Sequence, residues 1–255
     1  MITFATCWYE LNCKFNKEKY LEWMKNFLPN VKKFNLVIFT NKESKYIFED
    51  LIKDNEKIKV ILLPFEEFGT FNYKKNWIKN QINPINPLYN KINWKVNMLW
   101  CEKINFVCRA MKYFDSEFYG WCDIGYFRRK TDNVKDWPNN VMILDNRKIY
   151  YGLVDKKMFD CIKNNMIIPP NMIIPPNQFS IAGGFFVTHK QNIGWWKDTF
   201  YKKLDFYFEN DLLVKDDQII IVDCVCSNYD KFSLCEEKKD NICRNDHWFM
   251  FKRIL

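Results

Sequence analysis

Short apolar segments alternate with segments of helical periodicity through residues 2–64, and this alternation restricts the fold more than any other feature of the chain. The apolar segments are rich in β-branched and aromatic residues, which predicts buried strands at 2–9, 34–40 and 58–64. Between them, 16–28 and 42–54 carry apolar residues near helical spacing. Asn16 is placed to cap the first of these helices and Pro29 to end it. Strands that alternate with helices of this length predict an α/β fold with a parallel central sheet.

The remainder of the chain adds longer helices and a second group of strands. The pattern predicts helices at 91–114, 155–163, 192–210 and 216–228, and strands at 117–123, 178–189 and 231–237. A further strand pair is predicted at 140–145 and 148–153. The polar, proline-interrupted stretch 65–90 predicts a functional loop with short helical turns. The sequence NMIIPP occurs twice in tandem at 165–176, and we assign it no chemical role.

Composition sets the broad class of the protein. The chain has 255 residues, of which 48% are hydrophobic, enough for a substantial core in one domain. No stretch approaches the ~20 apolar residues of a membrane span, and the N-terminal segment lacks the features of a signal peptide, so we expect a cytoplasmic protein. The ten cysteines contain no Cys-x-x-Cys motif, and we expect them to be reduced, mostly structural thiols. The net charge of +8 fits an anionic ligand, but the lysines are dispersed and form no basic block of the kind that binds nucleic acid.

The carboxyl ends of the predicted strands are the place where an open α/β sheet binds its ligand. This rule places Thr6, Trp8, Tyr9 and Asp123 near one crevice. The aromatic side chains are suited to stack on a base, and the threonine hydroxyl is suited to hydrogen-bond to it. Packing in the core is the alternative for Trp8 and Tyr9, and the sequence does not decide between the two.

The segment FYGWCDIGYFRR, residues 118–129, carries a single carboxylate at the end of an aromatic strand. An unpaired acid is costly to bury, and a divalent cation that links Asp123 to two phosphates would offset that cost. Mg²⁺ and Mn²⁺ accept few protein ligands when phosphates and waters complete the octahedron. Gly125 would then leave space for the ligand, and Arg128 could pair with a phosphate or with a nearby aspartate. A capped turn without any ligand is the alternative.

Five segments together resemble one known family. They are TCWY in the first strand, CEKINFVCRA in a long helix, FYGWCDIGYFR, IAGGFF and the later DDQ. Over roughly residues 2–225 the chain is similar to the HtrL/YibB (WlaTC-type) glycosyltransferases of the GT-A class, and its richness in lysine and asparagine is similar to that of proteins from large DNA viruses.

The resemblance implies a single GT-A domain over 1–255, with a Rossmann-like, mostly parallel sheet flanked by helices. It implies a nucleotide-binding half at 1–125 and a smaller acceptor-side half at 126–255. The implied reaction moves a sugar from a nucleotide diphosphate donor, expected to be a UDP-hexose, to a hydroxyl group of a glycan or glycoprotein.

The resemblance also implies which residues bind the donor. Asp123 takes the place of the metal-binding acid in the Asp-x-Asp motif of GT-A enzymes, and Gly125 stands in place of the second acid. His247 corresponds to a late histidine that GT-A enzymes often supply to the metal, so Mn²⁺ or Mg²⁺ is the expected cofactor. Lys103 lies on the helix before this motif, where a cation can face the diphosphate; a solvated helix lysine is the alternative.

Two further segments take roles from the same resemblance. Ala182, Gly183 and Gly184 match the segment that passes beneath the donor sugar, where glycine permits close backbone approach; a structural bulge is the alternative. Asp217 matches the acid that deprotonates the acceptor hydroxyl during an inverting transfer. Asp216 would then cap the helix that starts here, and the alternative is that both acids serve as caps.

Three other functions compete with this prediction. A sugar-phosphate nucleotidyltransferase would normally carry a glycine-rich basic loop after the first strand, and TCWYELNCKF contains none. A nucleic-acid-binding protein would gather its basic residues on one face. A carbohydrate-binding module of the same fold would bind a nucleotide sugar without transferring it.

Overall fold

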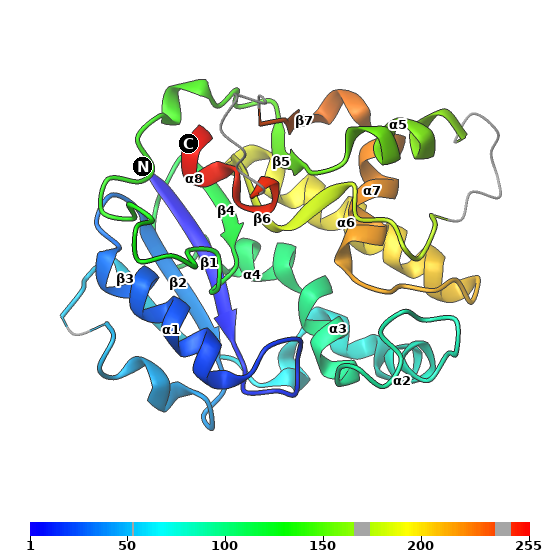
Figure 1. The fold of residues 1–255 in the computed structure, drawn as a ribbon, viewed down its shortest axis with the longest axis horizontal. Helices are drawn as coiled ribbons and strands as arrows, with labels where there is room; N and C mark the ends of the chain where they lie inside the picture. The colour runs from blue at the N-terminus through cyan, green and yellow to red at the C-terminus, as the bar shows by residue number, and fades with distance from the viewer. Residues whose placement is uncertain (53, 166–173, 238–245) are drawn as a thin grey trace.

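Seven strands form one sheet in the order β3-β2-β1-β4-β6-β5-β7 (Figure 1). The structure is a computed structural model that describes residues 1–52, 54–165, 174–237 and 246–255, so most of the NMIIPP duplication lies outside the described residues. The strands are β1 (Ile2–Trp8), β2 (Asn35–Thr40), β3 (Ile58–Leu62), β4 (Phe118–Cys122), β5 (Ile149–Leu153), β6 (Ile181–His189) and β7 (Phe232–Cys235). A mixed α/β fold with a mostly parallel central sheet is therefore confirmed.

The direction of β6 determines where the site forms. Strands β3, β2, β1 and β4 run parallel, whereas β6 runs antiparallel to both β4 and β5. Cys122 at the end of β4 pairs with Phe185 in β6, so the first residues of β6 lie beside the last residues of β4. The double glycine at 183–184 is thereby brought next to Asp123, although 60 or so positions separate them in the sequence.

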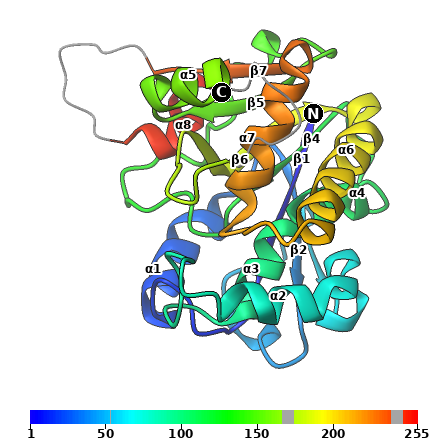
Figure 2. The same cartoon turned by 90° about the vertical axis from the view of Figure 1, so that its right-hand side faces the viewer.

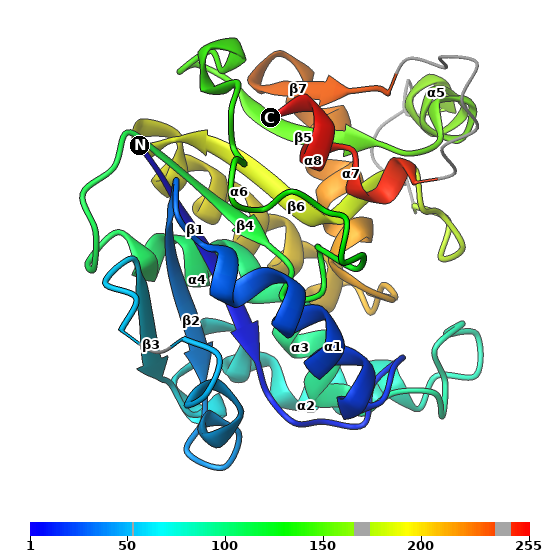
Figure 3. The same ribbon diagram turned by 60° about the vertical axis from the view of Figure 1, so that its left-hand side comes forward.

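Helices cover both faces of this sheet. They are α1 (Lys17–Phe27), α2 (Lys74–Gln81), α3 (Trp94–Cys101), α4 (Lys103–Ala110), α5 (Lys156–Asn165), α6 (Lys190–Glu209), α7 (Asp217–Ser227) and α8 (Phe251–Ile254). Figure 3 shows α1 and α8 in front of the sheet with α4 and α6 behind it, and Figure 2 shows the same arrangement from the side. Buried side chains of α4, α6 and α7 belong to one apolar cluster, and those of α1 and α8 belong to a second cluster on the opposite face.

Most of the predicted elements are present, and Asn16 caps α1 by accepting a hydrogen bond from the Lys19 amide as predicted. The helix predicted at 42–54 is wrong, because this segment forms only a 3₁₀ turn at Lys45–Phe48 and then bends at Asp54, whose φ of 53° is left-handed. The strand predicted at 140–145 is also wrong. Both edges of β5 are already paired, with β6 and β7, so no edge remains for the preceding segment to join.

Glu102 divides the helix predicted at 91–114 into α3 and α4. Its carboxylate is fully buried and accepts hydrogen bonds from the backbone amides of Gly69 and Thr70, which belong to the loop predicted at 65–90. That loop has more regular structure than predicted, since it contains α2. The break makes Lys103 the first residue of α4, at the carboxyl end of the parallel strands.

Candidate active site

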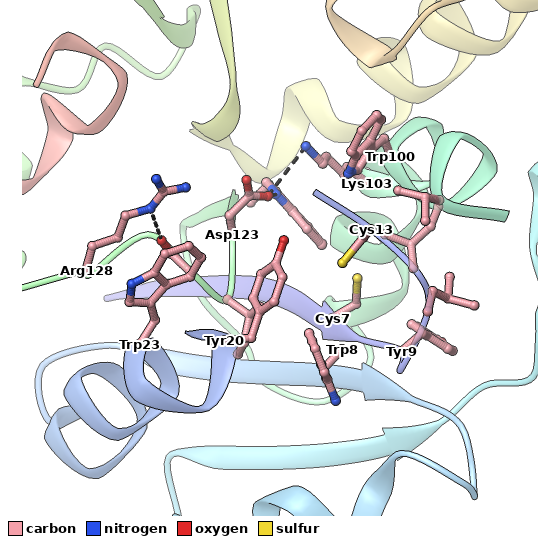
Figure 4. Close-up of a pocket in the computed structure, with 16 residues that line it drawn as sticks. Cys7, Trp8, Tyr9, Cys13, Tyr20, Trp23, Trp100, Lys103, Asp123 and Arg128 are labelled. Atoms are coloured by element: carbon pink, nitrogen blue, oxygen red, sulfur yellow. Dashed lines mark hydrogen bonds and ion pairs between the residues drawn. The ribbon is translucent and has the colours of Figure 1, made fainter. Parts of the chain in front are cut away.

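Two neighbouring cavities open at the carboxyl ends of β1 and β4. The first holds about 640 Å³ of empty space, and its lining includes Trp8 and Tyr9 from the end of β1, Tyr20 and Trp23 from α1, and Trp100 from α3 (Figure 4). The second holds about 1000 Å³, and its lining includes Gly183, Gly184, Asp216 and Asp217. Lys103, Asp123 and Arg128 line both cavities, and we call these three residues the shared rim.

Asp123 faces the cavities. Its side chain is 43% exposed and is therefore accessible to a ligand. A carboxylate enclosed in the packed interior would have excluded a ligand-binding role. Trp121 Nε1 donates a hydrogen bond to Asp123 Oδ1 at 2.6 Å, and the Asp123 amide donates to the Gly184 carbonyl at 2.9 Å. Both contacts fix the carboxylate at the junction of β4 and β6.

Lys103 lies between the two acids predicted to matter most. Its Nζ is 2.9 Å from Asp217 Oδ2 and 3.5 Å from Asp123 Oδ1, and it donates a hydrogen bond to the Gly183 carbonyl at 2.8 Å. Burial acts to lower the pKa of Lys103, but the two carboxylates outweigh it and hold the pKa above its usual value. The ammonium group is therefore charged, and the alternative of a solvated helix lysine is excluded because the side chain is buried.

The two adjacent aspartates differ in their surroundings. Asp217 is buried in the first turn of α7, and burial raises its pKa to about 6, although the charge of Lys103 acts in the opposite direction. Asp216 occupies the N-cap position, but its side chain makes no capping hydrogen bond. Its Oδ2 pairs with Lys215 at 3.2 Å, and its buried Oδ1 has no hydrogen-bond partner among the described residues. The capping role predicted for Asp216 is thus limited to its position in the backbone.

The double glycine makes room for the acids themselves. A Cβ atom at Gly183 would lie 2.8 Å from Asp217 Oδ2, and one at Gly184 would lie 3.0 Å from Asp123 Oδ2. Both glycines also line the second cavity, in keeping with the segment predicted beneath a donor sugar. Ala182 is buried within β6 and is not among the residues that line the two cavities.

We expect Gly183→Ala to reduce turnover strongly while the protein stays folded. The added methyl group collides with the Asp217 carboxylate, which must then move away from Lys103. Gly194→Ala is the matched control, because a Cβ there meets nothing within 4 Å, and alanine in the middle of α6 should stabilise the fold by about 1 kcal/mol. Initial rates and urea unfolding of both variants check this; equal rates for the two would contradict it.

Arg128 is held at the mouth of the site by aromatic rings. Its guanidinium carbon lies 4.3 Å from the centre of the Trp23 ring and 4.5 Å from that of Phe249, and Nε donates to the Gly125 carbonyl at 3.2 Å. Asp132, one of the aspartates near this arginine in the sequence, pairs instead with Lys252 at 2.9 Å. Figure 4 shows Arg128 and Lys103 on opposite sides of Asp123.

The residues predicted from the end of β1 are only partly brought to the site. Thr6 is fully buried in β1 and is not among the lining residues. Trp8 and Tyr9 line the first cavity but are mostly buried, and the Tyr9 hydroxyl already donates to the Leu63 carbonyl at 2.8 Å. Trp8 and Tyr9 therefore both pack in the core and line the cavity.

The lining residues that were missed in the sequence include three large aromatic side chains, Tyr20, Trp23 and Trp100. Tyr20 and Trp23 lie near helical spacing within 16–28, which is typical of residues that pack in the core, and Trp23 is largely buried. The signal that could have revealed them is the number of large aromatic residues on helices that start or end at the carboxyl edge of the sheet.

The predicted metal ligands are less well assembled. His247 Nδ1 lies 3.6 Å from Glu237 Oε2, and within the described ranges no group of three or more histidine, cysteine or acidic side chains is arranged to hold a metal. At Asp123 the protein offers one carboxylate, with the Lys103 ammonium group 3.5 Å away. These residues fit a divalent cation poorly, and the metal predicted at Asp123 and His247 stays a prediction.

Comparison with solved structures identifies the fold. An active-site mutant of LgtC superposes with a TM-score of 0.50 at 10% sequence identity, covering 98% of this chain and 82% of that chain. A galactosyltransferase LgtC complex with donor and acceptor sugar analogues has a TM-score of 0.49 at 10% identity, with coverage of 92% and 72%; mouse xyloside xylosyltransferase 1 has 0.48 at 11%, with 91% and 84%. The fold is that of the GT-A class. No protein-family model and no curated protein matches the sequence.

Proposed function

We propose that this protein is a glycosyltransferase that moves a sugar from a nucleotide diphosphate donor to a hydroxyl acceptor. The observation that carries the proposal is the shared rim: two cavities meet at Lys103, Asp123 and Arg128, where the phosphates of a donor would lie between its nucleoside and its sugar. The aromatic first cavity suits a base. The second cavity, with its acids and its glycines, suits the donor sugar and the acceptor.

Asp217 is the group we assign as the general base. Its carboxylate takes the proton of the acceptor hydroxyl while that oxygen forms a bond to the anomeric carbon of the donor sugar. The bond from the anomeric carbon to the diphosphate oxygen breaks, and its electron pair leaves with the nucleoside diphosphate. Lys103 and Arg128 are placed to stabilise the negative charge that develops there.

The finer parts of the proposal follow from the sequence. We propose a UDP-hexose as donor, a glycan or glycoprotein as acceptor, membership of the HtrL/YibB family, a viral source and a cytoplasmic location. The division into a nucleotide-binding half at 1–125 and an acceptor-side half at 126–255 belongs to the same proposal. Among the described residues, no helix combines the length and the apolar character needed to cross a bilayer.

A thermal-shift panel of UDP-, GDP- and CMP-sugars, followed by a release assay for the free nucleotide, tests the function. We expect one nucleotide sugar to raise the melting temperature and to be consumed when an acceptor is present. A nucleotidyltransferase would instead release pyrophosphate from a nucleoside triphosphate and a sugar phosphate. A carbohydrate-binding module would show the shift without release, and either result would contradict the proposal.

The pH dependence of the rate follows from the position of Asp217. A base must be ionised to accept a proton, and burial raises the pKa of this carboxyl from 3.8 to about 6. We therefore expect kcat/KM to be level above pH 7 and to fall about tenfold per pH unit below pH 6. Rates measured from pH 4.5 to 8 check this; a rate that stays level down to pH 4.5 would contradict the assignment.

A further inference from the structure

In this structure Asp123 contacts a side-chain cation, the ammonium group of Lys103. Three features of the shared rim concern this contact and its surroundings. The first is the geometry of Lys103. Its Nζ donates a hydrogen bond to the Gly183 carbonyl at 2.8 Å and forms an ion pair with Asp217 Oδ2 at 2.9 Å. The third contact, to Asp123, is 3.5 Å and longer than a normal hydrogen bond. The ammonium group is therefore available to a phosphate oxygen in the cavities that Lys103 lines.

The second feature is a barrier to a second carboxylate. A side chain at Gly125 would place its Cβ 2.6 Å from Trp23 Cε3, in the middle of a buried aromatic group. Trp23 is itself held against Arg128, so the ring cannot move without releasing the guanidinium group. The space that a second aspartate at position 125 would need is thus filled by Trp23, the ring that packs against Arg128.

The third feature is the orientation of Arg128. Its ring contacts and the bond from Nε to the Gly125 carbonyl fix the plane of the guanidinium group. Its terminal nitrogens have no hydrogen-bond partner among the described residues, and the side chain lines both cavities. A planar fork of free N–H donors matches the oxygens of a phosphate.

We propose that Lys103 and Arg128 together take the place of the divalent metal, so that the nucleotide diphosphate binds between two side-chain cations and sugar transfer needs no metal. This inference rests on the proposed glycosyltransferase function. Asp123 acts as a positioning residue that holds Lys103 toward the cavities. A dication at Asp123 would lie close to the fixed ammonium group, and their repulsion disfavours it in a partly buried site.

The test is isothermal titration of UDP and GDP into the full chain after dialysis against EDTA, repeated with added Mn²⁺. We expect one nucleotide to bind with an affinity that Mn²⁺ changes by less than about threefold. Arg128→Gln should weaken binding of that nucleotide about tenfold or more, because it removes charge-assisted hydrogen bonds to phosphate. It should leave the affinity for the corresponding nucleoside, uridine or guanosine, unchanged. Arg129→Gln is the control, because Arg129 is 69% exposed and is not among the lining residues.

The outcomes separate this inference from the proposed function. Binding that appears only with Mn²⁺ and is lost in Asp123→Asn would overturn the inference and leave the glycosyltransferase proposal intact. An equal effect of Arg128→Gln and Arg129→Gln would also overturn it. If neither UDP nor GDP binds, with or without Mn²⁺, the inference and the proposed function are overturned together.

Discussion

Asp217→Asn should remove sugar transfer while the donor still binds. Asparagine has nearly the same shape as aspartate but cannot accept the proton of the acceptor hydroxyl, so kcat should fall by about 10²- to 10⁴-fold, the range contributed by a general base. The acidic limb of the pH profile should disappear with it. Lys103 keeps its hydrogen bond to the Gly183 carbonyl and its contact with Asp123, so the neutral amide should not destabilise the fold severely.

Asp216→Asn is the matched control for this experiment. The two acids are adjacent and both buried, but Asp216 pairs with Lys215 rather than with Lys103. We expect the control to keep its rate within about tenfold of the wild type, because a lost hydrogen bond costs about 1 kcal/mol. Titration of the donor into both variants separates binding from turnover. A wild-type rate in Asp217→Asn, or a larger loss in Asp216→Asn, would assign the base elsewhere.

Lys103→Met should damage both the fold and the site. Methionine fills a similar volume but leaves the buried Asp217 carboxylate without its cation, and breaking a buried ion pair costs about 3–5 kcal/mol. Asp123 also loses its contact with the ammonium group, but its side chain is 43% exposed, so solvent compensates for much of that loss. The affinity for a nucleoside diphosphate should fall about tenfold or more, since a charge-assisted contact is lost.

Urea unfolding and donor titration measure these two effects separately. Lys103→Met combined with Asp217→Asn should recover part of the stability, because the second change removes the uncompensated charge. It should not recover binding. Lys112→Met, at an exposed position just after α4, is the control for loss of a lysine and should change neither quantity. Full stability in Lys103→Met alone would contradict the arrangement described here.

The sequence predicted the elements whose signals are local. The strand before Asp123, the helix capped by Asn16 and the apolar helix that begins at Asp217 each have a pattern in the neighbouring residues, and each is present. The segment at 42–54 has a helical pattern as well, but it forms turns. Its side chains are placed by packing against the rest of the sheet, which a local pattern does not describe.

The sequence indicated single candidate residues and a crevice at the strand ends, but not which of these residues contact one another. The closest contacts in the site join Lys103 in α4, Gly183 in β6 and Asp217 in α7 with Asp123, which directly follows β4. They meet because β6 runs antiparallel to β4, and the direction of a strand is set by long-range pairing rather than by its own residues. The double glycine was singled out in the sequence, and the space it creates is occupied in this structure by the two carboxylates.

The break between α3 and α4 at Glu102 is a second feature that the local sequence pattern does not predict. Nothing in the apolar pattern of 91–114 indicates an interruption, because the cause is a set of backbone amides from the loop around Gly69. That interruption makes Lys103 the first residue of a new helix. An acid within the apolar pattern of a predicted helix was the available signal that a distant segment would satisfy it.

A crystal structure with UDP or another nucleoside diphosphate bound tests the central claim most directly. We predict the base in the first cavity, among Trp8, Tyr20 and Trp23, and the phosphates between Lys103 and Arg128, with the second cavity left open for the sugar and the acceptor. A nucleotide bound away from these cavities, or phosphates that contact neither Lys103 nor Arg128, would contradict the account.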